Sequence, residues 1–288
     1  MPLQISGFSD TKIAFISKTD SELRRASLLF RALANPWLVN TGKFLVGFAF
    51  KTGLPVGWII KPTIYSHFVG GRSISECAPL VSSLSRYNVK SILDFSVEGN
   101  HDPEGIESTL NETLKSIANA SADKNIPFAV FKPTAFASAD LLDKAIPGTP
   151  PDPILAEEYD RFKERVEILC SEASRLGVPL MIDAEDSWYQ HLVDETVEAM
   201  MMKYNTEKVI VFNTLQMYRR DRINYLNECI SRARAGKYLL GIKFVRGAYM
   251  EKERNRALAM NYPSPIMADK KSTDGAFDEA ISISLDNL

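Results

Sequence analysis

The sequence predicts an α/β protein in which a helical region precedes a parallel β-sheet. From about residue 90 onwards, short apolar runs alternate with longer amphipathic stretches, which is the pattern of βα units. Residues 1–85 show helical patterns instead. Polar side chains follow the end of each later apolar run, as in the loops at the carboxyl ends of parallel strands. We therefore expect a helical region over residues 1–85 and five βα units over residues 86–288.

The N-terminal region is expected to contain two clear helices. The first covers residues 21–34 and ends before Pro36, and the second covers residues 37–51. The stretch that follows is broken by Pro55, Gly57 and Pro62.

Five apolar runs in the second region are predicted to be parallel strands. They cover residues 91–97, 127–134, 178–184, 208–218 and 238–245. The helix between the second and third strands is the clearest, because Asp152 can cap it, Pro153 suits its first position and Gly177 can end it. A later helix over residues 223–233 is expected to stop before Gly236, and a final helix covers residues 274–285.

Two architectures use such units, a doubly wound open sheet and a (β/α)8 barrel. Polar groups end every predicted strand, and in a barrel all these ends converge on one mouth. The turn after the first strand, VEGNHDPEG, lacks the GxGxxG phosphate-binding pattern of dinucleotide-binding open sheets. The sequence therefore favours a TIM-like barrel of which five βα units are present.

The composition excludes several classes of function. The chain has 288 residues and a formal net charge of −2, which does not indicate a nucleic-acid partner. Three widely spaced cysteines, Cys77, Cys170 and Cys229, fit reduced thiols in an intracellular protein better than disulfides or a metal site. The N-terminus lacks a secretory signal pattern, and no segment has the roughly 18 apolar residues of a membrane-spanning helix. We expect a cytoplasmic protein without a metal.

The strand ends carry groups that could bind a small zwitterion. Lys132 lies among apolar residues, so its ammonium group needs either an anionic ligand or an ion pair with Asp94 or Asp183. Strand alternation places Lys243 and Arg246 on opposite faces, so they need different partners. The three histidines form no recognisable site.

Other groups at these ends suit a planar ligand. Gln216 offers both a hydrogen-bond donor and an acceptor, which suits an amide-bearing ring or a backbone partner. Gly247 permits a close approach to the backbone or a tight turn, and Tyr249 supplies a ring and a hydroxyl. These residues alone indicate a barrel enzyme for a zwitterion.

Five motifs, in order, resemble those of the FAD-dependent proline dehydrogenases. They are ILDFSVEG, FKPTA, MIDAEDSWYQ, TLQMYRR and KFVRGAYMEKER. The helical N-terminal region resembles that of the single-function members with an N-terminal extension. The resemblance implies a distorted (β/α)8 barrel with FAD at its mouth. It also implies oxidation of L-proline to Δ1-pyrroline-5-carboxylate, with electrons passed to a quinone. Because quinones lie in membranes, the resemblance allows peripheral association with the inner face of a membrane.

The resemblance also implies roles for individual residues. Asp183 and Lys243 match catalytic positions, with Lys243 beside the flavin N5. Substrate-binding positions match Lys132, Tyr249 and Glu98. Cofactor-binding positions match Ala184, Gln216, Lys243, Arg246, Gly247 and Ala248.

Two features of the sequence depart from the family pattern. Many members have arginine where Lys243 stands, and lysine lacks the planar fork of arginine. The family barrel continues with three more strands and a helix that bears paired arginines for the proline carboxylate, whereas this sequence stops at Leu288. The chain is therefore expected to be a truncated member of this family that is inactive on proline by itself. The alternatives are a non-catalytic fragment and an aldolase-like barrel that forms a Schiff base on Lys132 or Lys243.

Overall fold

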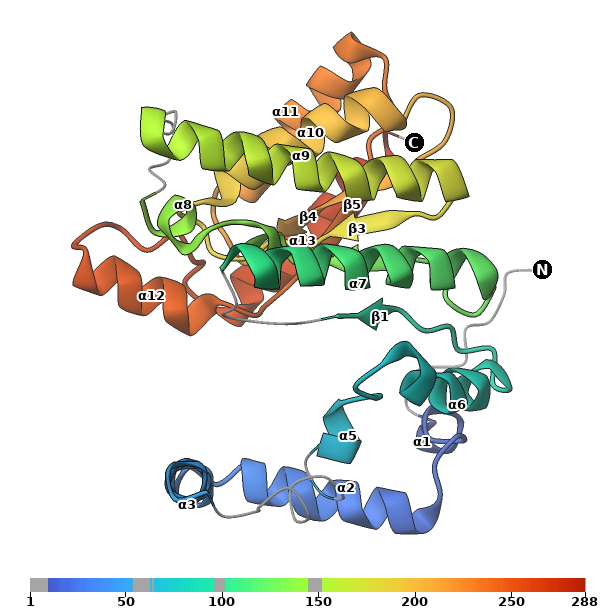
Figure 1. Cartoon of the computed structure of the whole chain (residues 1–288). Helices are drawn as coiled ribbons and strands as arrows, with labels where there is room; N and C mark the ends of the chain where they lie inside the picture. Colours follow the sequence, from blue (N-terminus) through green and yellow to red (C-terminus); the bar gives the residue numbers. More distant parts are fainter. Residues whose placement is uncertain (1–9, 54–62, 64, 96–101, 145–151, 288) are drawn as a thin grey trace. The chain divides into compact units, whose positions relative to one another are not determined.

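The structure is a computed structural model that describes residues 10–53, 63, 65–95, 102–144 and 152–287 (Figure 1). It divides into two compact units, Met1–Ser91 and Ile92–Leu288. Each unit is described separately below.

The described part of the N-terminal unit is helical. Its helices are α1 (Thr11–Ala14), α2 (Asp20–Leu33), α3 (Pro36–Lys51), α5 (Ser66–Phe68) and α6 (Ile74–Ser85). A capping box starts α2, because the Glu22 amide donates to Thr19 Oγ1 at 3.3 Å and the Thr19 amide donates to Glu22 Oε2 at 2.7 Å. Asn35 Oδ1 accepts from the Trp37 amide at 3.0 Å at the start of α3. Both predicted helices are confirmed.

The second unit contains a five-stranded parallel sheet in the order β1-β2-β3-β4-β5. The strands are β1 (Leu93–Asp94), β2 (Ala129–Phe131), β3 (Leu180–Ile182), β4 (Val211–Gln216) and β5 (Ile242–Val245). The predicted α/β fold with a parallel sheet is confirmed, and all five strands lie within their predicted ranges. They are shorter than predicted because the flanking residues form loops rather than ladder hydrogen bonds.

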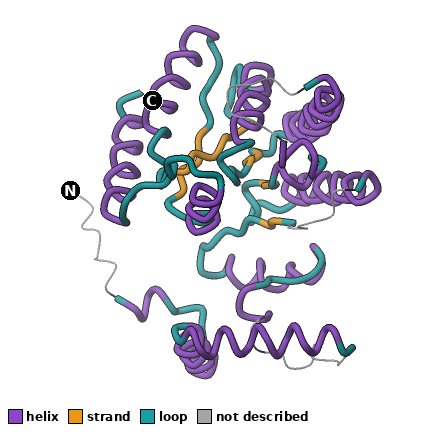
Figure 2. The backbone as a smooth tube through the Cα atoms, turned by 90° about the vertical axis from the view of Figure 1, so that its left-hand side faces the viewer, coloured by secondary structure: helices purple, strands orange, loops and turns teal. Residues whose placement is uncertain are grey.

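Helices follow each strand and pack against the sheet, which lies among them in Figure 2. They are α7 (Pro103–Ala122), the 3-10 helix η2 (Pro133–Phe136), α8 (Ala139–Lys144), α9 (Pro153–Leu176), α10 (Gln190–Tyr204), α11 (Arg222–Gly236), α12 (Met250–Ala259) and α13 (Lys270–Leu285). Helix α9 confirms its predicted signals. The Leu155 amide donates to Asp152 Oδ1 at 3.0 Å, and Gly177 adopts a φ of +71° after the last turn.

Two predicted helix boundaries were wrong. Helix α13 begins at Lys270, four residues before its expected start, and α11 ends one residue later than expected. Gly236 belongs to α11, and it is Lys237 that adopts the left-handed conformation, with a φ of 56° and its amide bonded to the Ala233 carbonyl. Glycine needs no strain in this conformation, but a lysine occupies it here because the chain turns one residue later than the glycine suggests.

The helix-covered face of the sheet is the core of the second unit. Leu215 of β4 packs with Leu226 of α11 and Ala280 of α13, and the ring of Phe244 in β5 meets that of Phe277 in α13. Strand alternation then requires the neighbours of Leu215 and Phe244 to point to the opposite face. That face carries the polar groups described next.

Candidate active site

Four residues form one row across the face of the sheet opposite Leu215 and Phe244. The register pairs Thr214 with Lys243. Phe131, Ile182 and Asn213 pair with one another across β2, β3 and β4. The next residues along the chain are Lys132, Asp183 and Thr214, which therefore also lie side by side. We call Lys132, Asp183, Thr214 and Lys243 the polar row. The sequence predicted that its two lysines and its aspartate converge, and the structure brings them together.

Charges of opposite sign alternate along the polar row. Lys132 Nζ forms an ion pair with Asp94 Oδ2 and lies 3.8 Å from Asp183 Oδ2, while Lys243 Nζ pairs with Asp183 Oδ1. The side chains of Lys132, Asp183 and Lys243 are only 20–26% exposed. Both oxygens of Asp183 therefore face ammonium groups, and the carboxylate links the two lysines.

The surroundings keep Lys132 charged. Burial lowers the pKa of its ammonium group, but the hydrogen bond and charge of Asp94, together with the charges of Asp183 and Glu185, outweigh burial and raise the pKa above its usual value. The ion pair that the sequence left as an alternative is therefore present. An anionic ligand at Lys132 would compete with Asp94.

A second row lies one step closer to the carboxyl ends of the strands. Glu185 accepts hydrogen bonds from the amide and hydroxyl of Thr134, at 2.9 and 3.0 Å. Gln216 Nε2 donates to the Glu185 carbonyl at 2.6 Å and to the Tyr218 hydroxyl at 2.8 Å. Burial is the largest influence on Glu185 and raises its pKa, despite the opposing hydrogen bonds from Thr134. This row is buried and largely satisfied internally.

Tyr249 reaches the same row from the loop after β5. Its hydroxyl lies 3.4 Å from Glu185 Oε1. The predicted pocket tyrosine is thus close to the second row.

Thr214 is the unexpected member of the polar row. Its side chain is only 2% exposed, and its hydroxyl has no hydrogen-bond partner within the described part of the chain. A buried hydroxyl without a partner costs free energy, so its presence beside two charged groups indicates a place where a ligand atom or water completes the site. Alternation could have found it in the sequence, because it lies two residues before Gln216 on the same face.

The segment after β5 is only partly directed at this site. Arg246 points toward α13, where its guanidinium group pairs with Asp274 at 3.0 Å and lies 4.6 Å from the centre of the Phe277 ring. Its side chain is therefore separate from the polar row. A Cβ atom added at Gly247 would meet no described atom within 4 Å, so the backbone there borders open space. A planar group could approach it closely.

Among the described residues, the structure shows no polar contact for the Ala184 side chain, and it does not describe Glu98. Ala184 is buried, between Asp183 and Glu185. Glu98 lies outside the described residues.

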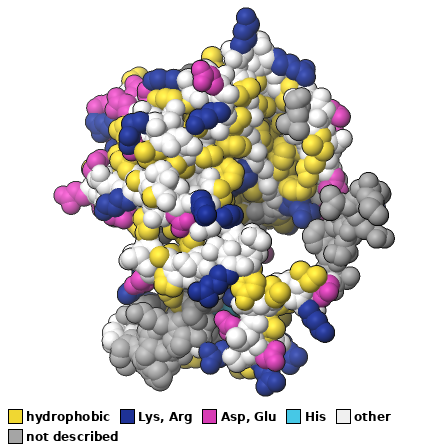
Figure 3. Space-filling view, turned by 90° about the vertical axis from the view of Figure 1, so that its right-hand side faces the viewer, with side chains coloured by type: hydrophobic (Ala, Val, Ile, Leu, Met, Phe, Trp, Pro, Cys, Tyr) yellow, Lys and Arg dark blue, Asp and Glu magenta, His cyan; other side chains and the backbone are white. Residues whose placement is uncertain are grey.

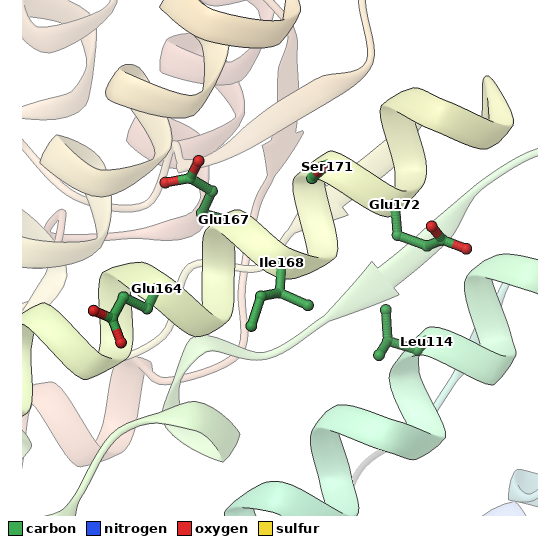
Figure 4. Close-up of a pocket in the computed structure, with 6 residues that line it drawn as sticks. All are labelled: Leu114, Glu164, Glu167, Ile168, Ser171 and Glu172. Carbon is green, nitrogen blue, oxygen red and sulfur yellow. The ribbon is translucent and has the colours of Figure 1, made fainter.

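The structure also contains polar features away from the strand ends. A surface pocket of about 710 Å³ lies between α7 and α9 and is lined by Leu114, Glu164, Glu167, Ile168, Ser171 and Glu172 (Figure 4). Its walls come from the outer helices, and two of its glutamates pair with Lys203 and Arg175. It is therefore not part of the polar row. Among the described residues, no group of three or more His, Cys, Asp or Glu side chains is arranged to hold a metal ion.

The donor set at the strand ends is compatible with a flavin. It combines an unpartnered buried hydroxyl at Thr214, an ammonium group at Lys243 and an open backbone edge at Gly247. Gln216 can contribute only by exchanging one of its present partners, because both hydrogens of its amide nitrogen are already donated.

The parallel sheet and its charged row define an α/β protein with charged groups at its strand ends, and comparison with known proteins identifies the family. The family model described as proline dehydrogenase matches residues 77–288. The chain belongs to the proline dehydrogenase family.

Two curated proteins illustrate the similarity, and one of them is named a proline dehydrogenase. The carbapenem antibiotics biosynthesis protein CarD of Pectobacterium carotovorum subsp. carotovorum is 30% identical over 76% of this chain and 57% of its own length. The mitochondrial proline dehydrogenase 1 of Dictyostelium discoideum is 26% identical over 97% of this chain and 56% of its own length. The chain thus spans a little over half the length of these curated relatives.

The fold has a counterpart among solved structures. Proline utilization A from Bdellovibrio bacteriovorus, in a crystal structure of the protein inactivated by N-propargylglycine, superposes with a TM-score of 0.66. The match is 18% identical in sequence and covers 76% of this chain and 24% of that chain. At this level of identity the likeness concerns the fold.

Proposed function

We propose that this chain is the flavin-binding part of a proline dehydrogenase, which oxidises L-proline to Δ1-pyrroline-5-carboxylate with FAD and passes the electrons to a quinone. The observation that carries the proposal is the alternation of charge from Asp94 through Lys132 and Asp183 to Lys243, within the residues that the family model matches. A row of this kind offers both signs of charge to a zwitterion within a few ångströms.

The five strands would be consecutive strands of a (β/α)8 barrel. Their order contains no reversal along the described sheet, whereas a doubly wound sheet reverses at its ligand-binding switch point. The polar row would then line the mouth of the barrel, where the binding sites of such barrels lie. The expectation that the barrel is interrupted after the fifth unit stays a prediction.

Lys132 would hold the substrate carboxylate. Its ammonium group is charged and only partly exposed, and its partner Asp94 is 34% exposed, so that Asp94 can return to water when a ligand carboxylate replaces it. Asp183 would keep both lysines in position, because each of its oxygens faces one of them. Tyr249 and Glu98 would complete the substrate side.

FAD, when bound, supplies the acceptor for the hydride of proline. The chain would hold it with Lys243 near its reactive edge, with the hydroxyl of Thr214, and with the backbone from Arg246 to Ala248. Ala184 and Gln216 would contact it from β3 and β4. The side chain of Arg246 would hold this segment against α13 by its ion pair with Asp274.

The chemistry of a Schiff base fits the site less well. A lysine nucleophile must be neutral, and enzymes obtain this by lowering its pKa. The pKa of Lys132 is raised instead, and the Lys243 ammonium is paired with Asp183. Lys132 is therefore held in the charged form, and Lys243 is engaged by a carboxylate.

The location of the protein follows from its proposed acceptor. A quinone resides in a lipid bilayer, so a cytoplasmic protein would meet it by peripheral association with the inner face of the membrane. Within the described residues, no helix has the length and apolar character needed to cross a bilayer.

The test separates cofactor binding from turnover. We expect the purified 288-residue chain to bind FAD with quenching of flavin fluorescence, and L-proline, but not D-proline or a 2-hydroxy acid, to perturb or bleach the visible flavin absorbance. Failure of the folded chain to bind FAD would refute the proposal, as would covalent trapping of a carbonyl compound on Lys132 by borohydride. Perturbation without bleaching would agree with the expectation that this chain alone does not turn over proline.

A further inference from the structure

Charge is distributed unevenly between the two units. Residues 1–91 contain 11 Lys and Arg against 4 Asp and Glu, a formal net charge of +7, whereas residues 92–288 contain 23 against 32, a net charge of −9. Most of the cationic unit precedes the match to the family model, which begins at residue 77. Asymmetry of this size indicates a separate interaction with an anionic partner.

One face of α3 is apolar and exposed. Trp37, Phe44 and Phe48 recur at intervals of seven and four residues, which places them on one side of a helix, and Leu45 lies beside them. Their exposed fractions are 70%, 72%, 54% and 58% in the order Trp37, Phe44, Phe48, Leu45. We call these four residues the α3 face. Ala49, next to Phe48 in the sequence, is buried.

Exposed cationic side chains lie on α3 and on α2. Lys43 and Lys51 of α3 are exposed, as are Arg24, Arg25 and Arg31 of α2, the helix that contacts α3. In Figure 3, hydrophobic side chains and Lys or Arg side chains both reach the visible surface of this unit. Aromatic and aliphatic groups beside a cluster of cations form a surface with two kinds of affinity.

The surface of a lipid bilayer with anionic headgroups matches both kinds. Interfacial helices insert Trp, Phe and Leu at the boundary of the acyl chains, while Lys and Arg remain with the headgroups. Helix α3 has 16 residues and does not meet the requirements of a spanning helix, which suits a position in the plane of the interface. A second copy of this unit is the less suitable occupant, because two surfaces of charge +7 repel each other.

We propose that α2 and α3 dock the protein onto an anionic lipid bilayer, with the α3 face inserted below the headgroups. This assigns the peripheral association, left open above, to particular residues. It can fail independently of the oxidation chemistry, because vesicle binding requires neither FAD nor proline.

The first test is flotation of the whole 288-residue chain with two kinds of vesicle, phosphatidylcholine alone and phosphatidylcholine mixed with phosphatidylglycerol. We expect binding to the mixed vesicles that weakens as salt is added, and much weaker binding to phosphatidylcholine. Phe44→Glu should weaken binding at least about tenfold, because it removes a ring that would insert into the bilayer and adds to the protein a negative charge that the anionic headgroups repel. Leu258→Glu is the matched control, since Leu258 is 82% exposed on α12 of the other unit.

A second test needs no charge reversal on the α3 face. Vesicles with brominated acyl chains should quench part of the tryptophan fluorescence, and Trp37→Phe should abolish that part. Arg24→Glu combined with Arg25→Glu should remove the preference for phosphatidylglycerol.

Three results would overturn the proposal. The first is equal vesicle binding by the unmodified chain and the Phe44→Glu variant, or no binding by either. The second is a lower melting temperature of Phe44→Glu than of Leu258→Glu, which would make the α3 face a packing surface inside the protein. The third is that the chain does not bind vesicles but associates with itself, and that Phe44→Glu abolishes this self-association. The partner of the α3 face would then be a second copy of the chain.

Discussion

Replacing Thr214 with valine should stabilise the flavin-free chain. The side chain is 2% exposed and its hydroxyl has no hydrogen-bond partner among the described residues. A buried polar group without a partner costs about 1–3 kcal/mol, and valine keeps the branched shape that suits a strand. We therefore expect the free energy of unfolding to rise by about 1 kcal/mol in urea denaturation. The melting temperature should rise by roughly 2–4 °C, the shift typical of a domain of 150–250 residues.

The same substitution should weaken FAD binding. If the hydroxyl donates to the cofactor, its loss removes a hydrogen bond of about 0.5–1.5 kcal/mol, which is roughly a 2- to 12-fold increase in Kd. The assay is titration of FAD by flavin fluorescence. Stability and affinity thus move in opposite directions, which a merely structural threonine would not produce.

Thr196→Val is the matched control. Thr196 is also 2% exposed, but its hydroxyl donates to the Leu192 carbonyl at 2.8 Å and lies 3.2 Å from the Tyr159 hydroxyl. This variant should lose stability and keep its FAD affinity. The reasoning about Thr214 is refuted if Thr214→Val destabilises the chain as Thr196→Val does, or if its FAD affinity equals that of the unmodified chain.

Three further predictions concern charged groups. Lys132→Met should weaken proline binding by roughly 10- to 150-fold, from the loss of about 1.5–3 kcal/mol, with unchanged FAD content, while Lys115→Met on α7 leaves both unaltered. Lys243→Ala should slow flavin reduction by proline in the turnover-competent protein more than it weakens proline binding, and an effect on binding alone would place Lys243 on the wrong side of the site. Burial raises the pKa of Asp221, but the charges and hydrogen bonds of Arg219 and Arg222 outweigh it and lower the pKa to about 2. The charged Asp221 therefore contributes stability above pH 3.8 that is lost as the pH falls through about 2, and unfolding of Asp221→Asn should depend less on pH in that window.

The sequence predicted the sheet well because each strand is an apolar run between a turn signal and an amphipathic helix. It predicted α9 to the residue at its start, since Asp152 and Pro153 act locally. It misplaced the end of α11 by one residue because a lysine, rather than the glycine, takes the left-handed conformation. Strand lengths were overestimated, since apolar residues in the flanking loops cannot be told from strand residues by hydrophobicity alone.

The sequence predicted that charged side chains converge at the strand ends, but it did not single out the buried hydroxyl. Lys132, Asp183 and Lys243 stood out because a charge next to an apolar run requires a partner. Thr214 did not stand out, because threonine is common in strands and its missing partner is visible only in three dimensions. The polar neighbour Asn213 points the other way and bonds to Asp194 of α10, so polarity alone did not distinguish the two faces.

The alternation of charge from Asp94 to Lys243 has a consequence for the choice of ligand. Two carboxylates and two ammonium groups give this set of four side chains no formal net charge. A ligand that carries one positive and one negative group leaves that electroneutrality intact, whereas a simple carboxylic acid or a simple amine leaves one charge in excess in a partly buried place. Affinity for an amino acid should therefore change little with ionic strength, and discrimination against singly charged analogues should come from the balance of the site itself.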